Sequence, residues 1–126
     1  MNKIAIIAGS GSLPLLIGQN LINKNYDIFY LCIKGFVNIE DYKNYNYTEI
    51  SITSFANILD QLKIKNINYI IMAGKITRPS LSDIKFDLST LSLIKEYLLE
   101  SKGDDKLLTI ISNFFLKKGY PLFNWV

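Results

Sequence analysis

A buried strand, a glycine loop and a helix stand together at the start of this chain. Residues 4–8 form the unbroken apolar run Ile-Ala-Ile-Ile-Ala, which is typical of a parallel strand covered on both faces. Gly9-Ser10-Gly11-Ser12-Leu13-Pro14 follows, and Pro14 suits the first turn of a helix, where its missing N–H is no loss. In an open α/β sheet, anions and nucleotides bind at such a junction. The start therefore predicts an α/β domain organised around this loop.

The later apolar runs continue this alternation of strands and helices. Further strands are predicted at 27–33, 47–52, 68–73 and 121–126, and further helices from the N-cap Ser54, from 87–89 to 103 and from 104 to 118. This order predicts a Rossmann-like, mostly parallel sheet with helices on both faces. Right-handed crossovers place the first strand centrally, the second and third strands on one side and the fourth on the other. The loops after the first and fourth strands then flank the switch point of the sheet, where ligands bind.

The segment between the second and third strands is expected to be a loop. Residues 36–46 mix tyrosines and asparagines, among them Tyr42 and Tyr45. Such side chains either cover the edge of the sheet or stack on a ligand, and covering the sheet is the more frequent role.

Composition limits the class of protein. A chain of 126 residues with 49% apolar and 20% charged residues fits one soluble globular domain, residues 1–126. The net charge of +3 comes without a dense basic segment, so no nucleic-acid partner is expected. The first apolar run is too short for a signal peptide, and no run reaches the ~20 residues of a membrane span. We expect a cytoplasmic protein, with peripheral contact at the inner membrane left open.

The residue types present restrict the chemistry. The chain has no histidine, which excludes Ser–His and Cys–His nucleophilic pairs and histidine metal sites. The single cysteine, Cys32, falls in a predicted strand, where a small buried hydrophobic role is expected rather than a reactive one. Backbone amides, lysines, one arginine, carboxylates and hydroxyls remain. Those groups suit a phosphorylated ligand, or magnesium held through oxygens.

The first loop is not a known nucleotide fingerprint. Pro14 stands where the third glycine of a dinucleotide motif would be, and Lys34 stands where its acidic residue is expected. No Gly-Lys-Ser/Thr follows, so the loop is not a P-loop either. A phosphate-binding loop and a plain tight turn remain as the two interpretations.

Two later stretches carry further candidate residues. Gly74-Lys75-Ile76-Thr77-Arg78-Pro79 follows the fourth predicted strand and contains the single arginine of a chain with thirteen lysines. Arg78 suits a phosphate or carboxylate, or else bridges to a neighbouring loop. Gly103-Asp104-Asp105 ends one predicted helix and caps the next, which local chemistry favours over binding a metal or a sugar hydroxyl.

Together, the three stretches resemble the N-terminal domain of the LpxI-type UDP-2,3-diacylglucosamine diphosphatases. Each is weakly specific alone, but they occur in order along nearly the whole chain. The resemblance implies hydrolysis of UDP-2,3-diacylglucosamine to 2,3-diacylglucosamine 1-phosphate and UMP, with magnesium, in lipid A biosynthesis. It also implies a set of substrate-facing or interface positions: Gly9, Ser10, Gly11, Ser12, Leu13, Pro14, Gly74, Lys75, Thr77, Arg78, Gly103, Asp104 and Asp105.

The resemblance also sets a limit. Members of that family continue into a C-terminal domain, where the main catalytic aspartate and the metal site are expected, and this sequence ends at Val126, about where that domain would begin. We therefore expect a binding half of an enzyme, without catalytic or metal-binding residues of its own. A split gene with a partner chain, a degraded gene and a truncated sequence are the three explanations. The alternative function is a non-catalytic module, a relic or regulator, that binds a lipid phosphate or nucleotide.

Overall fold

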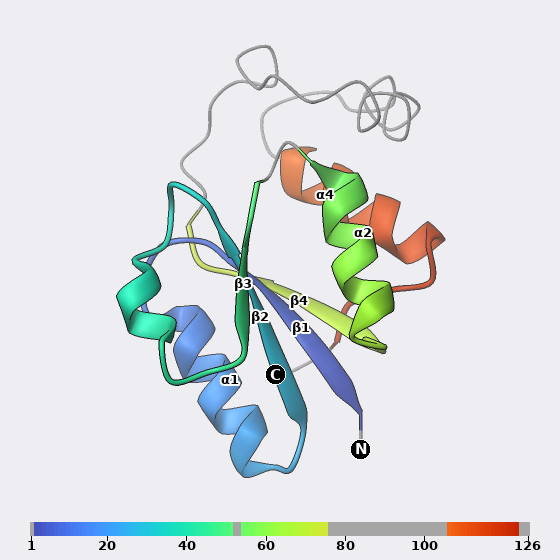
Figure 1. The fold of residues 1–126 in the computed structure, drawn as a ribbon. Helices are drawn as coiled ribbons and strands as arrows, with labels where there is room; N and C mark the ends of the chain where they lie inside the picture. Colours follow the sequence, from blue (N-terminus) through green and yellow to red (C-terminus); the bar gives the residue numbers. More distant parts are fainter. Residues whose placement is uncertain (1, 52–53, 76–105, 124–126) are drawn as a thin grey trace.

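Four parallel strands form the sheet at the centre of the molecule (Figure 1). The computed structural model describes residues 2–51, 54–75 and 106–123. The strand order is β3-β2-β1-β4, with β1 at Lys3–Ala8, β2 at Asp27–Ile33, β3 at Tyr47–Ile50 and β4 at Tyr69–Ala73. This order and direction confirm the predicted α/β, Rossmann-like sheet. Because the strands are parallel, all four begin at one end of the sheet, called the amino end here, and finish at the carboxyl end.

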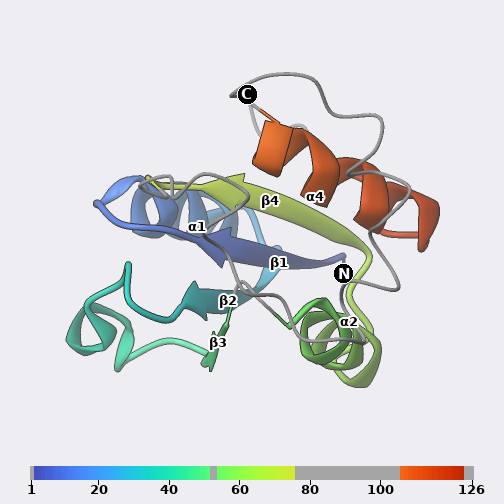
Figure 2. The ribbon, with the colours of Figure 1, turned by 90° about the horizontal axis from the view of Figure 1, so that it is seen from above.

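Helices cover both faces of this sheet. Helix α1 (Leu13–Asn23) and the short 3-10 helix η1 (Ile39–Tyr42) lie on one face, and α2 (Phe55–Ile64) and α4 (Lys106–Lys117) lie on the other (Figures 1 and 2). Pro14 stands in the first turn of α1, as predicted. The described helices include none long and apolar enough to cross a bilayer.

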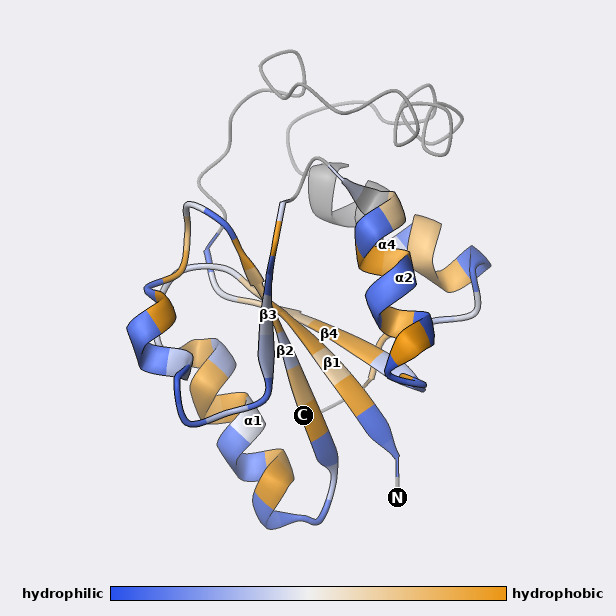
Figure 3. Ribbon diagram, viewed as in Figure 1, coloured by the Kyte–Doolittle hydropathy of each residue, from blue (hydrophilic) through white to orange (hydrophobic). Residues whose placement is uncertain are grey.

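Strand β1 supplies side chains to both cores. Ile4 and Ile6 face α1, whereas Ala5 and Ile7 face α2 and α4, and all four are almost fully buried. Phe114 and Phe115 of α4 complete the second core. Apolar residues accordingly fill most of β1, β2 and β4 in Figure 3, whereas β3 is largely hydrophilic. Burial on both faces explains why β1 reads as a continuous apolar run.

The core beneath α1 is built from close aromatic contacts. The Tyr30 ring packs edge-on against Tyr42, with ring centroids 5.1 Å apart, and against Tyr45 at 5.7 Å. Tyr42 is buried, so the segment 36–46 covers the sheet with this side chain and contains a turn of helix where a loop was expected. Gly18 lets α1 approach, because a Cβ atom there would lie only 1.8 Å from the Tyr30 hydroxyl.

The three described α-helices end in the same way. Asn25, Asn66 and Gly119 take positive φ angles of 69°, 55° and 96°, each two residues after the last residue of its helix. At each end the next amide donates back to the helix: Tyr26 N to Leu21 O, Ile67 N to Leu62 O and Tyr120 N to Phe115 O. This is the Schellman pattern, which satisfies carbonyls that the last turn leaves free.

Some local expectations differ from the structure. Ser54 does precede α2 as predicted, but its side chain makes no capping hydrogen bond. The strand expected at 121–126 is, over its described residues, a single parallel bridge between Leu122 and Ile70. The helix predicted from 87–89 to 103 lies outside the described residues, as does the predicted start of α4 at Asp104.

Candidate functional site

The loops after β1 and β4 are joined to each other at the carboxyl end of the sheet. Gly9 N donates to Ala73 O over 2.8 Å, Ser10 N to Lys75 O over 2.8 Å and Lys75 N to Ser10 O over 2.9 Å. The Ser10 hydroxyl adds a bond of 3.0 Å to Lys75 O. The two loops expected at the switch point therefore form one unit.

Two glycines make this close approach possible. A Cβ atom on Gly9 would lie 2.6 Å from Lys75 O, and one on Gly74 would lie 2.7 Å from the Gly9 carbonyl carbon. Gly74 also has a φ of +90°, which disfavours any other residue. A sequence pattern indicates this contact. Both β1 and β4 end in an alanine that is followed by a glycine, and the two alanines, Ala8 and Ala73, pair in register.

The start of α1 provides the groups that an anion could contact. Gly9 and Ser10 already use their amides, but the amides of Gly11, Ser12 and Leu13 have no backbone partner among the described residues. Ser12 is exposed and its side chain makes no capping bond. A helix N-terminus carries about half a positive charge, and these three amides stand at the start of α1.

Lys75 adds a positive charge to the loop beside this helix start. Its side chain is exposed, and its backbone is fixed by the two bonds to Ser10. Amides, a hydroxyl and an ammonium group form the donor set that suits phosphate oxygens. The arrangement can therefore bind and orient an anion.

The structure brings together only part of the predicted site. Gly9 and Ser10 lie against Gly74 and Lys75. Gly11 to Pro14 lead from there into α1, with Pro14 buried and Leu13 exposed. Five further predicted residues lie outside the described part of the chain: Thr77, Arg78, Gly103, Asp104 and Asp105. Their roles stay predictions.

The described residues do not provide a magnesium site. Within 2–51, 54–75 and 106–123, no three carboxylate, histidine or cysteine side chains gather as a metal would need. Because these residues do not fit the ion, we assign it no step. Cys32 is fully buried, and burial, with a smaller contribution from the neighbouring Glu49, raises the pKa of its thiol to about 12. The thiol is thus neutral and inert, as predicted for a small buried hydrophobe.

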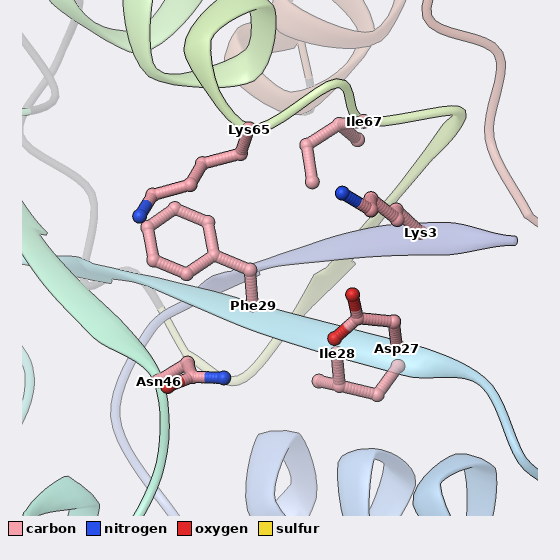
Figure 4. A pocket seen from close by; sticks show the side chains of 7 residues that line it. All are labelled: Lys3, Asp27, Ile28, Phe29, Asn46, Lys65 and Ile67. Carbon is pink, nitrogen blue, oxygen red and sulfur yellow. The ribbon is translucent and has the colours of Figure 1, made fainter. Parts of the chain in front are cut away.

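A separate pocket of about 240 Å³ opens at the amino end of the sheet (Figure 4). Its lining contains none of the predicted site residues and consists of Lys3, Asp27, Ile28, Phe29, Asn46, Lys65 and Ile67. The Lys65 ammonium lies 5.1 Å from the centre of the Phe29 ring, which holds that side chain over the pocket.

Comparison with known proteins gives two matches that agree with each other. The model of the LpxI N-terminal domain matches residues 3–124. The UDP-2,3-diacylglucosamine pyrophosphatase LpxI of Caulobacter vibrioides is 24% identical over 123 residues. That alignment covers 97% of this chain and 44% of the Caulobacter protein, so the chain spans less than half the length of that relative.

Proposed function

This chain belongs to the LpxI N-terminal domain family, and we propose that it forms the N-terminal half of a UDP-2,3-diacylglucosamine diphosphatase. The reaction would hydrolyse UDP-2,3-diacylglucosamine to 2,3-diacylglucosamine 1-phosphate and UMP in lipid A biosynthesis. Since the chain aligns with 44% of the relative, turnover requires the other part of such a protein, in the same polypeptide or in a partner chain. An acylated substrate favours peripheral contact with the inner membrane, and we place this contact on the cytoplasmic side.

The joined loops at the carboxyl end of the sheet are the observation that carries this proposal. In hydrolysis, water adds to one phosphorus of the diphosphate and the bridging oxygen leaves with the other phosphate. The amides of Gly11 to Leu13 and the Lys75 ammonium would hold the phosphate oxygens and offset the charge that develops on them. Arg78 would add a bidentate contact. The role of this chain is to bind and orient, and the metal would be held by the other domain.

The test is a complementation assay. The chain alone is expected to leave UDP-2,3-diacylglucosamine intact, and a mixture with the uncovered part of the Caulobacter relative is expected to release UMP. Gly9→Ala should lower that turnover at least tenfold, because its Cβ atom would collide with Lys75 O and part the loops. Gly35→Ala is the control for a substitution without a collision: its φ of +89° strains the backbone locally, but no heavy atom beyond its chain neighbours lies within 4 Å of its Cβ position. Rapid turnover by the chain alone would refute the shared site.

A non-catalytic binding module is the second candidate. The described site consists of amides, a hydroxyl and an ammonium group, which bind phosphate without activating water. Calorimetry with UMP, UDP-2,3-diacylglucosamine and the lipid 1-phosphate separates the candidates when read beside the turnover assay. Binding without turnover in the mixture supports a module, and absence of binding together with no effect of Arg78→Ala contradicts both.

A further inference from the structure

Each of the three described α-helices has an exposed apolar side chain near its C-terminus, with a lysine one or two residues after it. Ile22 precedes Lys24 at the end of α1, Ile64 lies between Lys63 and Lys65 in α2, and Leu116 precedes Lys117 and Lys118 in α4. The exposed fractions are 37% for Ile22, 68% for Ile64 and 57% for Leu116. A lysine at a helix C-terminus complements the helix dipole, but that explanation does not account for the exposed isoleucines and leucine.

The topology brings these three helix ends to the amino end of the sheet. Asp27 N donates to Asn2 O directly after α1, and Asn68 N donates to Lys3 O directly after α2. After α4, Pro121 O accepts from Ile70 N at the start of β4. Figure 1 shows the three connections turning back toward the starts of the strands, on the same side as the N-terminus. Figure 3 shows hydrophilic residues at these turns and at the starts of β1 and β2.

Among the described residues, the charge at this end of the molecule is positive. Five lysines lie there besides Lys117, which has an interaction of its own: Lys3, Lys24, Lys63, Lys65 and Lys118. The described acidic side chains nearest to them in the fold are Asp27 and Asp60, which leaves a net of three positive charges, five less two. These lysines are scattered along the sequence, so only the fold gathers them.

Some of these lysines are held in place by aromatic rings. Lys65 lies over Phe29 at 5.1 Å, and Lys118 lies over Phe114 at 5.8 Å. Lys65 also lines the amino-end pocket with Lys3, which gives that pocket two ammonium groups (Figure 4). Leu122, 53% exposed, adds another apolar side chain at the start of β4.

We propose that this amino end is a docking surface for an anionic lipid bilayer. Lysines attract a diffuse negative surface without needing fixed geometry, whereas recognition of single phosphates favours arginine. Exposed isoleucine and leucine beside lysine are typical of segments that rest in the headgroup layer. Nucleic-acid surfaces and acidic proteins would pair with the charge but would leave these apolar side chains in water.

Such docking has a consequence for the joined loops at the other end. The carboxyl end of the sheet would face away from the bilayer, so an acylated substrate would have to leave the bilayer before its diphosphate could reach Gly9 to Leu13 and Lys75. The docking proposal rests only on the lysine charges and the exposed apolar side chains. It is therefore independent of the proposed diphosphatase function.

Vesicle sedimentation with the full 126-residue chain tests this surface. We expect at least tenfold tighter binding to vesicles with 30% phosphatidylglycerol than to pure phosphatidylcholine, and loss of that binding in 0.5 M NaCl. Lys65→Gln with Lys118→Gln should weaken binding about tenfold. Lys34→Gln with Lys75→Gln is the matched control, because both lysines are exposed and lie at the carboxyl end of the sheet, and it should change binding less than twofold.

Apolar contact needs its own variant. Ile64→Ser with Leu116→Ser keeps the charge and exposes no core, because both side chains already face solvent, and it should weaken vesicle binding about threefold. The proposal is overturned if anionic vesicles are not bound, if the two lysine pairs lose equal affinity, or if the apolar variant binds like the unmodified chain. Duplex DNA bound as tightly as the anionic vesicles would also overturn it.

Discussion

Gly9 and Gly74 matter through the space that a missing Cβ leaves between the two loops. Gly74→Ala combines a positive φ with a collision against the Gly9 carbonyl carbon, whereas Gly35→Ala has a positive φ and open space around it. We expect Gly74→Ala to lower the free energy of unfolding by about 3 kcal/mol and Gly35→Ala by about 1 kcal/mol. Urea denaturation measures both. Equal losses would show that the loops can part at little cost.

Cys32 and Tyr30 make stability depend on pH in the alkaline range. Burial raises the pKa of each to about 12, above the unfolded values near 8.5 and 10. Below pH 8 both groups are protonated in the folded and in the unfolded chain, so their contribution to the free energy of unfolding is fully present. As pH rises from 8 toward 12, the unfolded chain loses protons that the folded chain keeps, and the free energy of unfolding falls.

Cys32→Ala isolates the thiol in this effect. Each unit between the folded and unfolded pKa is worth about 1.4 kcal/mol, so by pH 10 the unmodified chain should have lost about 2 kcal/mol more than the variant, relative to pH 7.5. Urea titrations at the two pH values provide the comparison. Identical losses would mean that the thiol ionises as readily in the fold as in the unfolded chain.

At the scale of elements, the helix ends depend on residues that tolerate a positive φ. Asn66 follows α2 with a φ of 55°. Asn66→Ala should lower the free energy of unfolding by about 1 kcal/mol, whereas Asn66→Gly should leave it unchanged or slightly raised. Both variants lose the same amide, so thermal denaturation of the pair separates backbone conformation from side-chain bonding. An equal loss in both would assign the cost to the amide.

Elements whose burial leaves a clear pattern of apolar residues in the sequence could be predicted from it. The strand predicted at 27–33 agrees with β2 because both faces are covered, and the four-strand order follows from right-handed crossovers. Tyr42 was expected in a loop, and the helical turn around it follows from packing against Tyr30, a contact between distant residues that local pattern does not encode. The strand expected at 121–126 pairs at Leu122 alone among its described residues.

The position of the two candidate loops could be predicted from the sequence, but the hydrogen bonds between them could not. The switch point placed the loops after β1 and β4 together, as the bonds between Ser10 and Lys75 confirm. The family resemblance implies that Gly9 and Ser10 are substrate-facing or interface positions, and in the structure their amides bind the neighbouring loop. The amides that a loop uses for hydrogen bonds within the fold depend on how closely a second loop approaches. Tertiary packing determines that approach.

At the scale of the whole molecule, the last described segment connects elements from both ends of the chain. The Phe123 ring lies edge-on to Tyr26, at 5.2 Å between centroids, and to Tyr69, at 5.4 Å. Its amide donates to Ile70 O over 2.8 Å. Tyr26 follows α1 and Tyr69 begins β4, so the Phe123 ring packs against both the connection from α1 to β2 and the edge strand β4.

Phe123→Ala should therefore destabilise the connection after α1 and strand β4, as well as the segment that contains Phe123. We expect a loss of about 2 to 3 kcal/mol in the free energy of unfolding, less than for a fully buried phenylalanine because Phe123 is only partly buried. Leu122→Ala is the matched control next to it, since Leu122 is largely exposed and should cost less than about 0.5 kcal/mol. Hydrogen exchange should show weaker protection at Tyr26 and Ile70 together in Phe123→Ala. Weaker protection at Ile70 alone would mean that the ring stabilises only the outer strand, and that the two ends of the chain are not coupled through it.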